Sequence, residues 1–422
     1  MRVATLSRTP SFLVLFAFIL VMIDGYDMFI VSFVAPLVAH DLHLASNNLG
    51  AVFAAGLAGS MLGGLTLGAV ADRVGRRPVL VGALVFAGIM TVLCSQATSF
   101  GGFASLRFLT GFGLGGLLAA VVPLIAEYFP AERRSQAVTS MFIGYPLGAV
   151  VGGIVTAVLI SRGWRSLFVG TGAVTLLLLP LALPMKETLA SKLDKAEHDR
   201  EDRILSKRLS ILELFTEGRL WTTLTTSFGI FCLLLLTYLL NSWTPLIAVR
   251  LGFKPQTAAM CGVFLNLGGV IGALSSMLWV RRLGVFRLAA LMVSVGSLGI
   301  AAIGFAAHAA ASLFLALFVS GVLVIGAQQN SPAMSVQLYP RRMRAAGAGW
   351  QFAAGRLGSI LGPIIGGLLF SSGVAYETLF LLLAVPALLG GGAYARVHYL
   401  LRSRTQIDSH PTTKALEKGV LP

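Results

Sequence analysis

The chain has 422 residues, of which 56% are hydrophobic and 12% are charged, with a formal net charge of +15 at pH 7. A soluble globular protein contains about 25% charged residues, so this composition excludes an ordinary soluble protein and is typical of one that crosses a membrane many times. The three cysteines show no paired spacing, and they predict neither a disulfide framework nor a metal site.

Twelve apolar windows follow one another along the chain, and a helix needs ~20 such residues to span a bilayer. The windows lie at about 12–37, 48–71, 79–98, 103–126, 137–160, 166–185, 220–244, 258–280, 286–307, 311–336, 346–370 and 376–400. We therefore predict twelve transmembrane helices. A polar interval of mixed charge separates the sixth window from the seventh. The predicted domain plan is an N-terminal six-helix bundle at 1–185, a linker at 186–219, a C-terminal six-helix bundle at 220–404 and a tail at 405–422.

The positive charges indicate how the chain is oriented. Most of the 32 Lys and Arg residues precede the first window, follow the last, or fall in alternate connections, whereas the other connections contain only Arg162, Arg165, Arg250 and Lys254. Because positively charged loops stay in the cytoplasm, both termini and the linker are predicted to be cytoplasmic. The expected location is a bacterial-type inner membrane. The placement of the positive charge is a signal of membrane topology, so no nucleic-acid partner is expected.

The two halves of the sequence repeat each other. The fifth and eleventh windows contain four glycines at the same spacing: Gly144, Gly148, Gly152 and Gly153 in one, and Gly358, Gly362, Gly366 and Gly367 in the other. Six windows separate the copies, so both halves cross the membrane in the same direction. This pattern predicts a parallel repeat of two bundles.

Two acidic residues, Asp24 and Asp27, stand in the middle of the first window. Their spacing places them on one side of a helix. An ionised carboxylate at this depth costs about 2.5–3.5 kcal/mol of insertion free energy. We therefore expect both to face a wet cavity or a cationic partner, where a carboxylate can take up and release a proton. The alternative is a buried ion pair that only holds helices together.

The connection between the second and third windows reads GAVADRVGRR at residues 68–77. It resembles the signature loop of the major facilitator superfamily, and the twelve windows and the repeat are similar to that superfamily over almost the whole chain. The resemblance implies an all-α membrane fold, usually monomeric, in which twelve transmembrane helices form two six-helix bundles related by a parallel pseudo-twofold repeat.

The same resemblance implies that this loop stabilises a closed cytoplasmic gate through a charge cluster. Glu127, at the end of the fourth window, is positioned to join it. The gating group is Gly68, Asp72, Arg73, Gly75, Arg76 and Glu127. The alternative is a positive loop that sets topology only. In the second half Arg281 stands at the aspartate position, so only the first copy is expected to hold the cluster.

The fourth window contains RFLTGFGLGG at residues 107–116, which resembles a further motif of the superfamily. Arg107 lies at a depth that allows it to pair with a carboxylate of the first window. We assign Asp24, Asp27 and Arg107 to proton coupling, which requires that their interactions change with conformation. The alternative is a permanent structural salt bridge.

A finer resemblance comes from DGYD at 24–27, from Asn241, Trp243 and Pro245, and from the run between Trp350 and Pro363. These residues resemble the aromatic acid:proton symporters. The resemblance implies uptake of benzoate, hydroxybenzoates, related acids or their ring-cleavage products. It also implies that the first-window aspartates are needed for transport and that the proton is the coupling ion, with no other cofactor.

Arg356 lies in the middle of the eleventh window, and no acidic residue of the second half lies at a similar depth. A substrate carboxylate, bound by two N–H donors, is the partner that we expect. The alternatives are backbone carbonyls, polar side chains, or a reach across to Asp24 or Asp27. Other candidate substrate contacts are Tyr145, Asn241, Gln328, Gln329, Asn330 and Trp350. For each of their polar groups the alternative is interhelical hydrogen bonding.

We therefore predict a proton-coupled secondary transporter, not an enzyme, that imports a small aromatic acid by alternating access. The sequence contains no phosphate-binding loop of the kind that binds ATP. One alternative is a proton-driven efflux antiporter. The displaced Pro146 disfavours it, because antiporters of the superfamily carry Gly-Pro-xx-Gly-Gly in the fifth window. Another is a sensor or scaffold without transport, for which linker and tail are short.

Overall fold

The computed structural model describes residues 10–129, 138, 140–183, 211–216, 218–306, 309–340 and 343–408. Every regular element in these residues is a helix. Twelve of the described helical segments are long and apolar enough to cross a membrane. The prediction of twelve transmembrane helices is confirmed, and the predicted windows agree closely with the observed spans.

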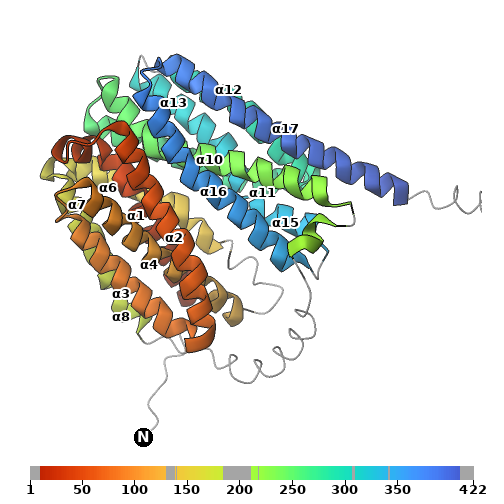
Figure 1. Ribbon diagram of the computed structural model, residues 1–422, viewed down its shortest axis with the longest axis horizontal. Coiled ribbons are helices and arrows are strands. Elements are labelled where there is room, and N and C mark those ends of the chain that lie inside the picture. The colour runs from red at the N-terminus through yellow and green to blue at the C-terminus, as the bar shows by residue number, and fades with distance from the viewer. Residues whose placement is uncertain are drawn as a thin grey trace, which may run out of the picture.

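The helices form two bundles that lie side by side, coloured red to yellow and green to blue (Figure 1). The first bundle contains α1 (Pro10–Asp41), α2 (Ser46–Val74), α3 (Arg76–Cys94), α4 (Phe100–Tyr128), α6 (Gly144–Leu159), η1 (Ile160–Arg162), α7 (Trp164–Leu177) and α8 (Leu179–Ala182). The second contains α10 (Leu220–Arg250), α11 (Pro255–Leu283), α12 (Val285–Phe305), α13 (Ala310–Ser320), η5 (Gly321–Ile325), α14 (Gly326–Gln328), α15 (Ser331–Leu338), α16 (Arg344–Ser371) and α17 (Tyr376–Asp408).

Two predicted segments, the linker and the tail, lie largely outside the described residues. In the predicted linker at 186–219, the described part consists of residues 211–216, which include η3 (Ile211–Phe215), and residues 218–219. In the predicted tail at 405–422, residues 405–408 still belong to α17, and the others lie outside the described range.

The repeated glycines bring pairs of helices into backbone contact. A Cβ built on Gly148 of α6 would collide with the Met22 carbonyl oxygen of α1, and one on Gly362 of α16 would collide with the Leu235 carbonyl oxygen of α10. Glycine permits this approach because it has no side chain. The pairs α1–α6 and α10–α16 are therefore built in the same way, as the sequence repeat predicts.

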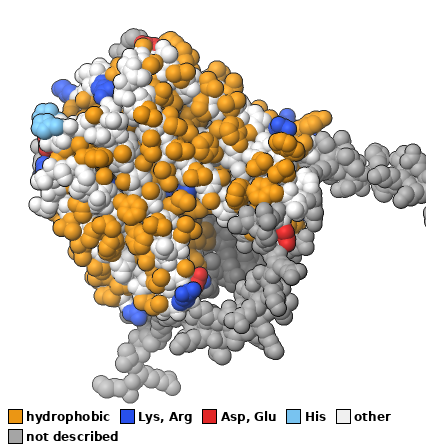
Figure 2. Space-filling model, viewed as in Figure 1, with side chains coloured by type: hydrophobic (Ala, Val, Ile, Leu, Met, Phe, Trp, Pro, Cys, Tyr) orange, Lys and Arg blue, Asp and Glu red, His pale blue; other side chains and the backbone are white. Residues whose placement is uncertain are grey.

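The outward surface of the bundles is apolar. Hydrophobic side chains cover most of the face shown in Figure 2, and Lys and Arg side chains are sparse on it. Large apolar residues such as Leu177 and Leu278 are more than two-thirds exposed. Such a continuous apolar surface is stable in lipid and not in water, so the chain is an integral, multi-pass membrane protein.

The bundles close against each other at one end. We call the end near residues 10 and 408 the terminal end, and the opposite end the far end. At the far end, Arg250 of α10 donates from Nη2 to Ser46 Oγ of α2 at 2.7 Å. Ser32 of α1 donates to the Ser242 carbonyl of α10 at 3.2 Å, and the Trp243 ring lies 5.6 Å from Phe53 of α2. These far-end contacts join the bundles.

Candidate functional site

A cavity of about 540 Å³ lies between the two bundles. Its walls come from the first halves of α6 and α16, the middle of α10, the second half of α11, and the segment from Gln328 to Ser335. The cavity therefore extends from the middle of the molecule toward the terminal end, whereas the far end is closed. Its volume suits a small organic molecule.

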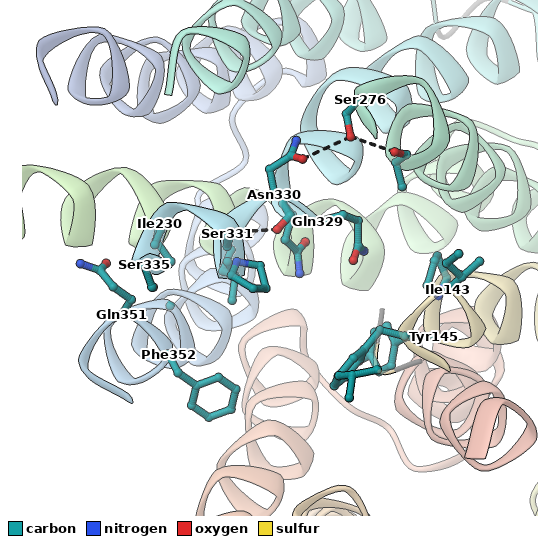
Figure 3. A pocket seen from close by; sticks show the side chains of 18 of the residues that line it. Ile143, Tyr145, Ile230, Ser276, Gln329, Asn330, Ser331, Ser335, Gln351 and Phe352 are labelled. Carbon is teal, nitrogen blue, oxygen red and sulfur yellow. Dashed lines mark hydrogen bonds between the residues drawn. The ribbon is translucent and has the colours of Figure 1, made fainter. Parts of the chain in front are cut away.

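Five of the predicted substrate residues line the cavity: Tyr145, Gln328, Gln329, Asn330 and Arg356. Tyr145 comes from the first bundle and the other four from the second. In the close view, Tyr145 stands across the cavity from Gln329 and Asn330 (Figure 3). The structure thus brings residues far apart in the sequence to opposite walls of one space.

Tyr145 belongs to an aromatic wall. Its hydroxyl lies 3.2 Å from the Tyr238 hydroxyl of α10, and its ring packs edge-on against Phe29 of α1 with centroids 5.8 Å apart. Gly25 of α1 abuts the Tyr145 backbone, where any Cβ would collide with the carbonyl oxygen. Of these rings, Tyr145 and Tyr238 line the cavity and offer flat surfaces against which a ligand ring can pack.

The amide side chains lie at a break in the tenth span. The sequence predicted one continuous helix over 311–336, but η5 is a π-helical segment and the chain turns at Gln329 and Asn330 before α15. Pro332 follows in the first turn of α15, where its missing N–H fits a helix start and cannot continue the preceding helix. A π-helical segment inside a span commonly marks a functional position.

Three amide atoms at the cavity have no hydrogen-bond partner among the described residues: Gln328 Oε1, Asn330 Nδ2 and Gln351 Oε1. The other amide atom of Asn330, Oδ1, accepts a hydrogen bond from Ser276 Oγ at 3.3 Å (Figure 3). Buried polar atoms are usually paired, so these three mark places where a ligand can bond. The sequence did not predict that Gln351 lines the cavity, although Gln351 lies only five residues before Arg356 in α16.

Arg356 lies in the cavity wall, where its guanidinium carbon is 5.0 Å from the centre of the Phe352 ring. This is a cation–π contact. Among the described residues, its guanidinium forms no ion pair or hydrogen bond. The carboxylate on which it acts electrostatically is Asp24, across the interface between the bundles. The predicted lack of a partner within its own bundle agrees with this placement.

Asp27 and Arg107 form a buried ion pair inside the first bundle. Arg107 Nη1 donates to Asp27 Oδ2 at 3.0 Å, and Nη2 donates to the Asp27 carbonyl oxygen at 2.8 Å. Thr91 of α3 donates to Asp27 Oδ1 at 3.0 Å. Each of the paired residues is 1% exposed. The predicted pairing of Arg107 with a carboxylate is therefore present, and it lies away from the cavity lining.

Asp24 is 2% exposed but is bonded quite differently. Its Oδ1 has no hydrogen-bond partner among the described residues. The charged groups that act on it are Arg356, Asp27 and Arg107, with Arg356 the strongest. The two acids of the first span therefore occupy separate environments.

The signature loop lies at the terminal end. Gly75 ends α2 and begins α3 with φ = 119°, a conformation that glycine adopts readily. Asp72 and Arg76 lie one turn apart with charged atoms at 4.0 Å, and Arg73 is exposed. Gly68 faces Ala119 where α2 packs on α4. Glu127 lies in α4, and its side chain is outside the described set.

Asn241 and Trp350 do not line the cavity. Asn241 Oδ1 accepts from Asn266 Nδ2 at 2.6 Å and so joins α10 to α11. Trp350 donates to Ser227 Oγ at 2.9 Å, and its ring packs edge-on against Phe215 of η3 at 5.1 Å. In this conformation both residues hold helical segments together.

Comparison with known proteins agrees with this architecture. The sequence profile of the Major Facilitator Superfamily matches residues 17–331 and 281–422. The chain belongs to the major facilitator superfamily. Among solved structures, a D-xylose–proton symporter superposes with a TM-score of 0.74 at 18% identity, covering 91% of this chain and 97% of that one. The predicted fold class is confirmed.

Curated relatives are transporters of aromatic acids. The chain is 30% identical over 411 residues to the 4-hydroxybenzoate transporter PcaK of Acinetobacter baylyi, covering 91% of this chain and 90% of that protein. It is 32% identical over 393 residues to a gallate transporter of Pseudomonas putida, with 88% of each chain covered. These relatives confirm the resemblance to the aromatic acid:proton symporters.

Proposed function

We propose that the protein imports aromatic carboxylic acids together with protons by alternating access. The observation that carries the proposal is Arg356, a cation in the wall of a cavity between the bundles whose guanidinium forms no ion pair among the described residues. An aromatic acid supplies that carboxylate. The relatives named above, which transport such acids, support the same substrate class.

The cavity offers a binding site for each part of such a molecule. The carboxylate binds Arg356 through charge-assisted hydrogen bonds. The ring packs against Tyr145 on the opposite wall. Ring hydroxyls bond to the unpartnered amide atoms of Gln328, Asn330 and Gln351. A hydroxylated acid satisfies more of these groups than benzoate does, so hydroxybenzoates are the preferred substrates in this proposal.

The state described here corresponds to release. We place the terminal end in the cytoplasm of a bacterial-type cell, because most Lys and Arg residues lie in the connections at that end. The cavity then faces inward while the far-end contacts close the outer side. Uptake requires the opposite state, in which the bundles separate at the far end and close around Gly68–Arg77. The protein acts as a monomer, because each chain contains both walls of the cavity.

Transport by purified protein in liposomes tests the proposal. Labelled 4-hydroxybenzoate should accumulate when the outside is made acidic, and a protonophore should abolish the accumulation. Liposomes without protein, and excess unlabelled gallate, benzoate or D-xylose, are the controls. Uptake that merely equilibrates and ignores the pH gradient would show uniport, and proton-driven extrusion would show antiport. Either result would overturn the proposal.

A further inference from the structure

The two acids of α1 differ in every contact that decides whether a carboxylate can exchange a proton. We propose that Asp24, and not Asp27, carries the coupled proton, and that ionised Asp24 competes with the substrate carboxylate for Arg356. This inference rests on the proposed function and specifies how the proton and the substrate are linked within the same site.

The Asp27 carboxylate is fully hydrogen-bonded within the first bundle. Both carboxylate oxygens accept hydrogen bonds, one from Arg107 and one from Thr91, and Arg107 also binds the backbone carbonyl of the same residue. Protonation would leave a fully buried guanidinium without a counter-charge, which is strongly unfavourable. Asp27 therefore functions as the fixed partner of Arg107.

Asp24 is buried to the same degree but no described residue donates a hydrogen bond to its side chain. A buried carboxylate without donors is stable as an anion only if a cation faces it. The charged groups around it are Asp27 on its own helix, Arg107 on α4 and Arg356 on α16. Because Arg107 is neutralised by Asp27, Arg356 is the cation left to balance Asp24.

Tyr145 connects Asp24 to the cavity. It lines the cavity, and both Asp24 and Arg356 act on its hydroxyl electrostatically. Gly25, next to Asp24, lets α1 pack directly against the Tyr145 backbone. The acid, the tyrosine and the arginine thus come from α1, α6 and α16; Tyr145 and Arg356 line the cavity, and Asp24 lies behind the cavity lining.

The charges at this point explain obligatory coupling. Ionised Asp24 and Arg356 balance each other when the cavity is empty. A substrate carboxylate adds a second negative charge, and two carboxylates then share one guanidinium. Uptake of one proton by Asp24 restores the balance and leaves Arg356 to the substrate. Because linkage is reciprocal, substrate binding draws a proton onto Asp24, and a proton on Asp24 strengthens substrate binding.

Binding of 4-hydroxybenzoate to the purified protein tests this inference. Measurements between about pH 5.5 and 8.5 keep the ligand ionised, because carboxylic acids titrate near pH 4.3. The wild-type affinity should fall as the pH rises, by up to about tenfold per pH unit once Asp24 is mostly ionised. In weakly buffered solution, binding should take up about one proton per ligand, as reciprocal linkage requires.

Asp24→Asn should bind with an affinity that no longer depends on pH, without proton uptake, and its counterflow exchange in liposomes should likewise ignore pH. Asp41→Asn, which removes an exposed acid from the far end of the same helix, is the matched control and should keep the wild-type pH dependence. Size-exclusion chromatography checks that each variant is folded.

The possible outcomes separate the two proposals. Proton uptake that persists in Asp24→Asn would overturn this inference alone, and so would a folded Asp27→Asn variant that binds ligand without taking up a proton. Failure of the wild-type protein to bind any aromatic acid would overturn the proposed function, and this inference with it.

Discussion

The two bundles share one framework and differ in their polar residues. The glycine contacts align Met22 of α1 with Leu235 of α10, and so place Leu240 where the first bundle has Asp27. The equivalent contacts of α4 and α13, at Phe108 and Phe318, place Leu317 where the first bundle has Arg107. The buried ion pair of one bundle is therefore a pair of buried leucines in the other.

The reverse holds at the cavity. The glycine alignment of α6 with α16 places Phe142 at the position of Arg356, and both residues line the cavity. At the cavity the first bundle thus contributes Tyr145, whereas the second contributes Tyr238, the arginine and the amides. Close backbone contacts at matching glycines reproduce the fold in each half, and the differences between the halves create a site with two unlike walls.

The largest effect is expected where the halves differ in buried charge. Asp27→Leu should strongly lower thermal stability, because it leaves Arg107 buried without a partner, at a cost of about 3–5 kcal/mol. Adding Arg107→Leu copies the leucines of the second bundle and should restore most of the stability, and proton-driven accumulation should remain because Asp24 is retained. Melting temperatures and liposome uptake check both variants. A double variant as unstable as Asp27→Leu would break the comparison.

The next effect concerns the arginine that only the second bundle has. Arg356→Gln removes the charge that binds the substrate and should weaken 4-hydroxybenzoate binding by about 10- to 150-fold, since a hydrogen bond to a charged group contributes roughly 1.5–3 kcal/mol. Binding titrations measure this change. Arg281→Gln, at an exposed arginine of the same bundle, is the control and should bind normally. Equal affinities of wild type and Arg356→Gln would refute this role.

The shared framework predicts equal effects in the two halves. Gly148→Ala and Gly362→Ala should each destabilise the protein by about 1–3 kcal/mol, because the new methyl group forces two backbones apart. Gly82→Ala and Gly392→Ala are the controls, since a Cβ at either position meets nothing within 4 Å. Thermal unfolding of the four variants measures the difference. A marked loss of stability for one of these two variants only would show that the two bundles are not packed equivalently.

The smallest effect is expected at the far end. Arg250→Gln removes the hydrogen bond to Ser46 and the contact of the guanidinium with the Phe370 ring. The closed far end should lose about 1–3 kcal/mol relative to the open one, because a charged hydrogen bond is lost. Spin labels on the exposed residues Asn47 and Lys254 report the separation of the bundles there. An unchanged distance distribution would show that this contact does not stabilise closure.

The sequence predicted most of the fold because length and apolarity determine a transmembrane span. It also predicted a carboxylate partner for Arg107, since the two lie at similar depth. Three residues along a helix turn the side chain by about 300°, so Asp24 and Asp27 point about 60° apart. That angle lets one face Arg107 and the other face α6 and α16, a difference that spacing alone did not reveal.

Other features depend on contacts that periodicity does not encode. The break at Gln329 lies inside an apolar run that reads as one helix. The bond from Arg250 to Ser46 requires the register between bundles, which no local pattern contains. Trp350, part of the symporter-like motif, packs against η3, and Gln351 beside it has the unpartnered amide oxygen at the cavity. Trp350 and Gln351 are neighbours in the sequence but point to different faces of α16.

A structure of the protein with bound 4-hydroxybenzoate would show whether Arg356 binds the substrate carboxylate. We expect the carboxylate within hydrogen-bond distance of the Arg356 guanidinium and the ring against Tyr145, between the two bundles. An acid bound outside this cavity, or within it with its carboxylate directed away from Arg356, would refute this role of Arg356.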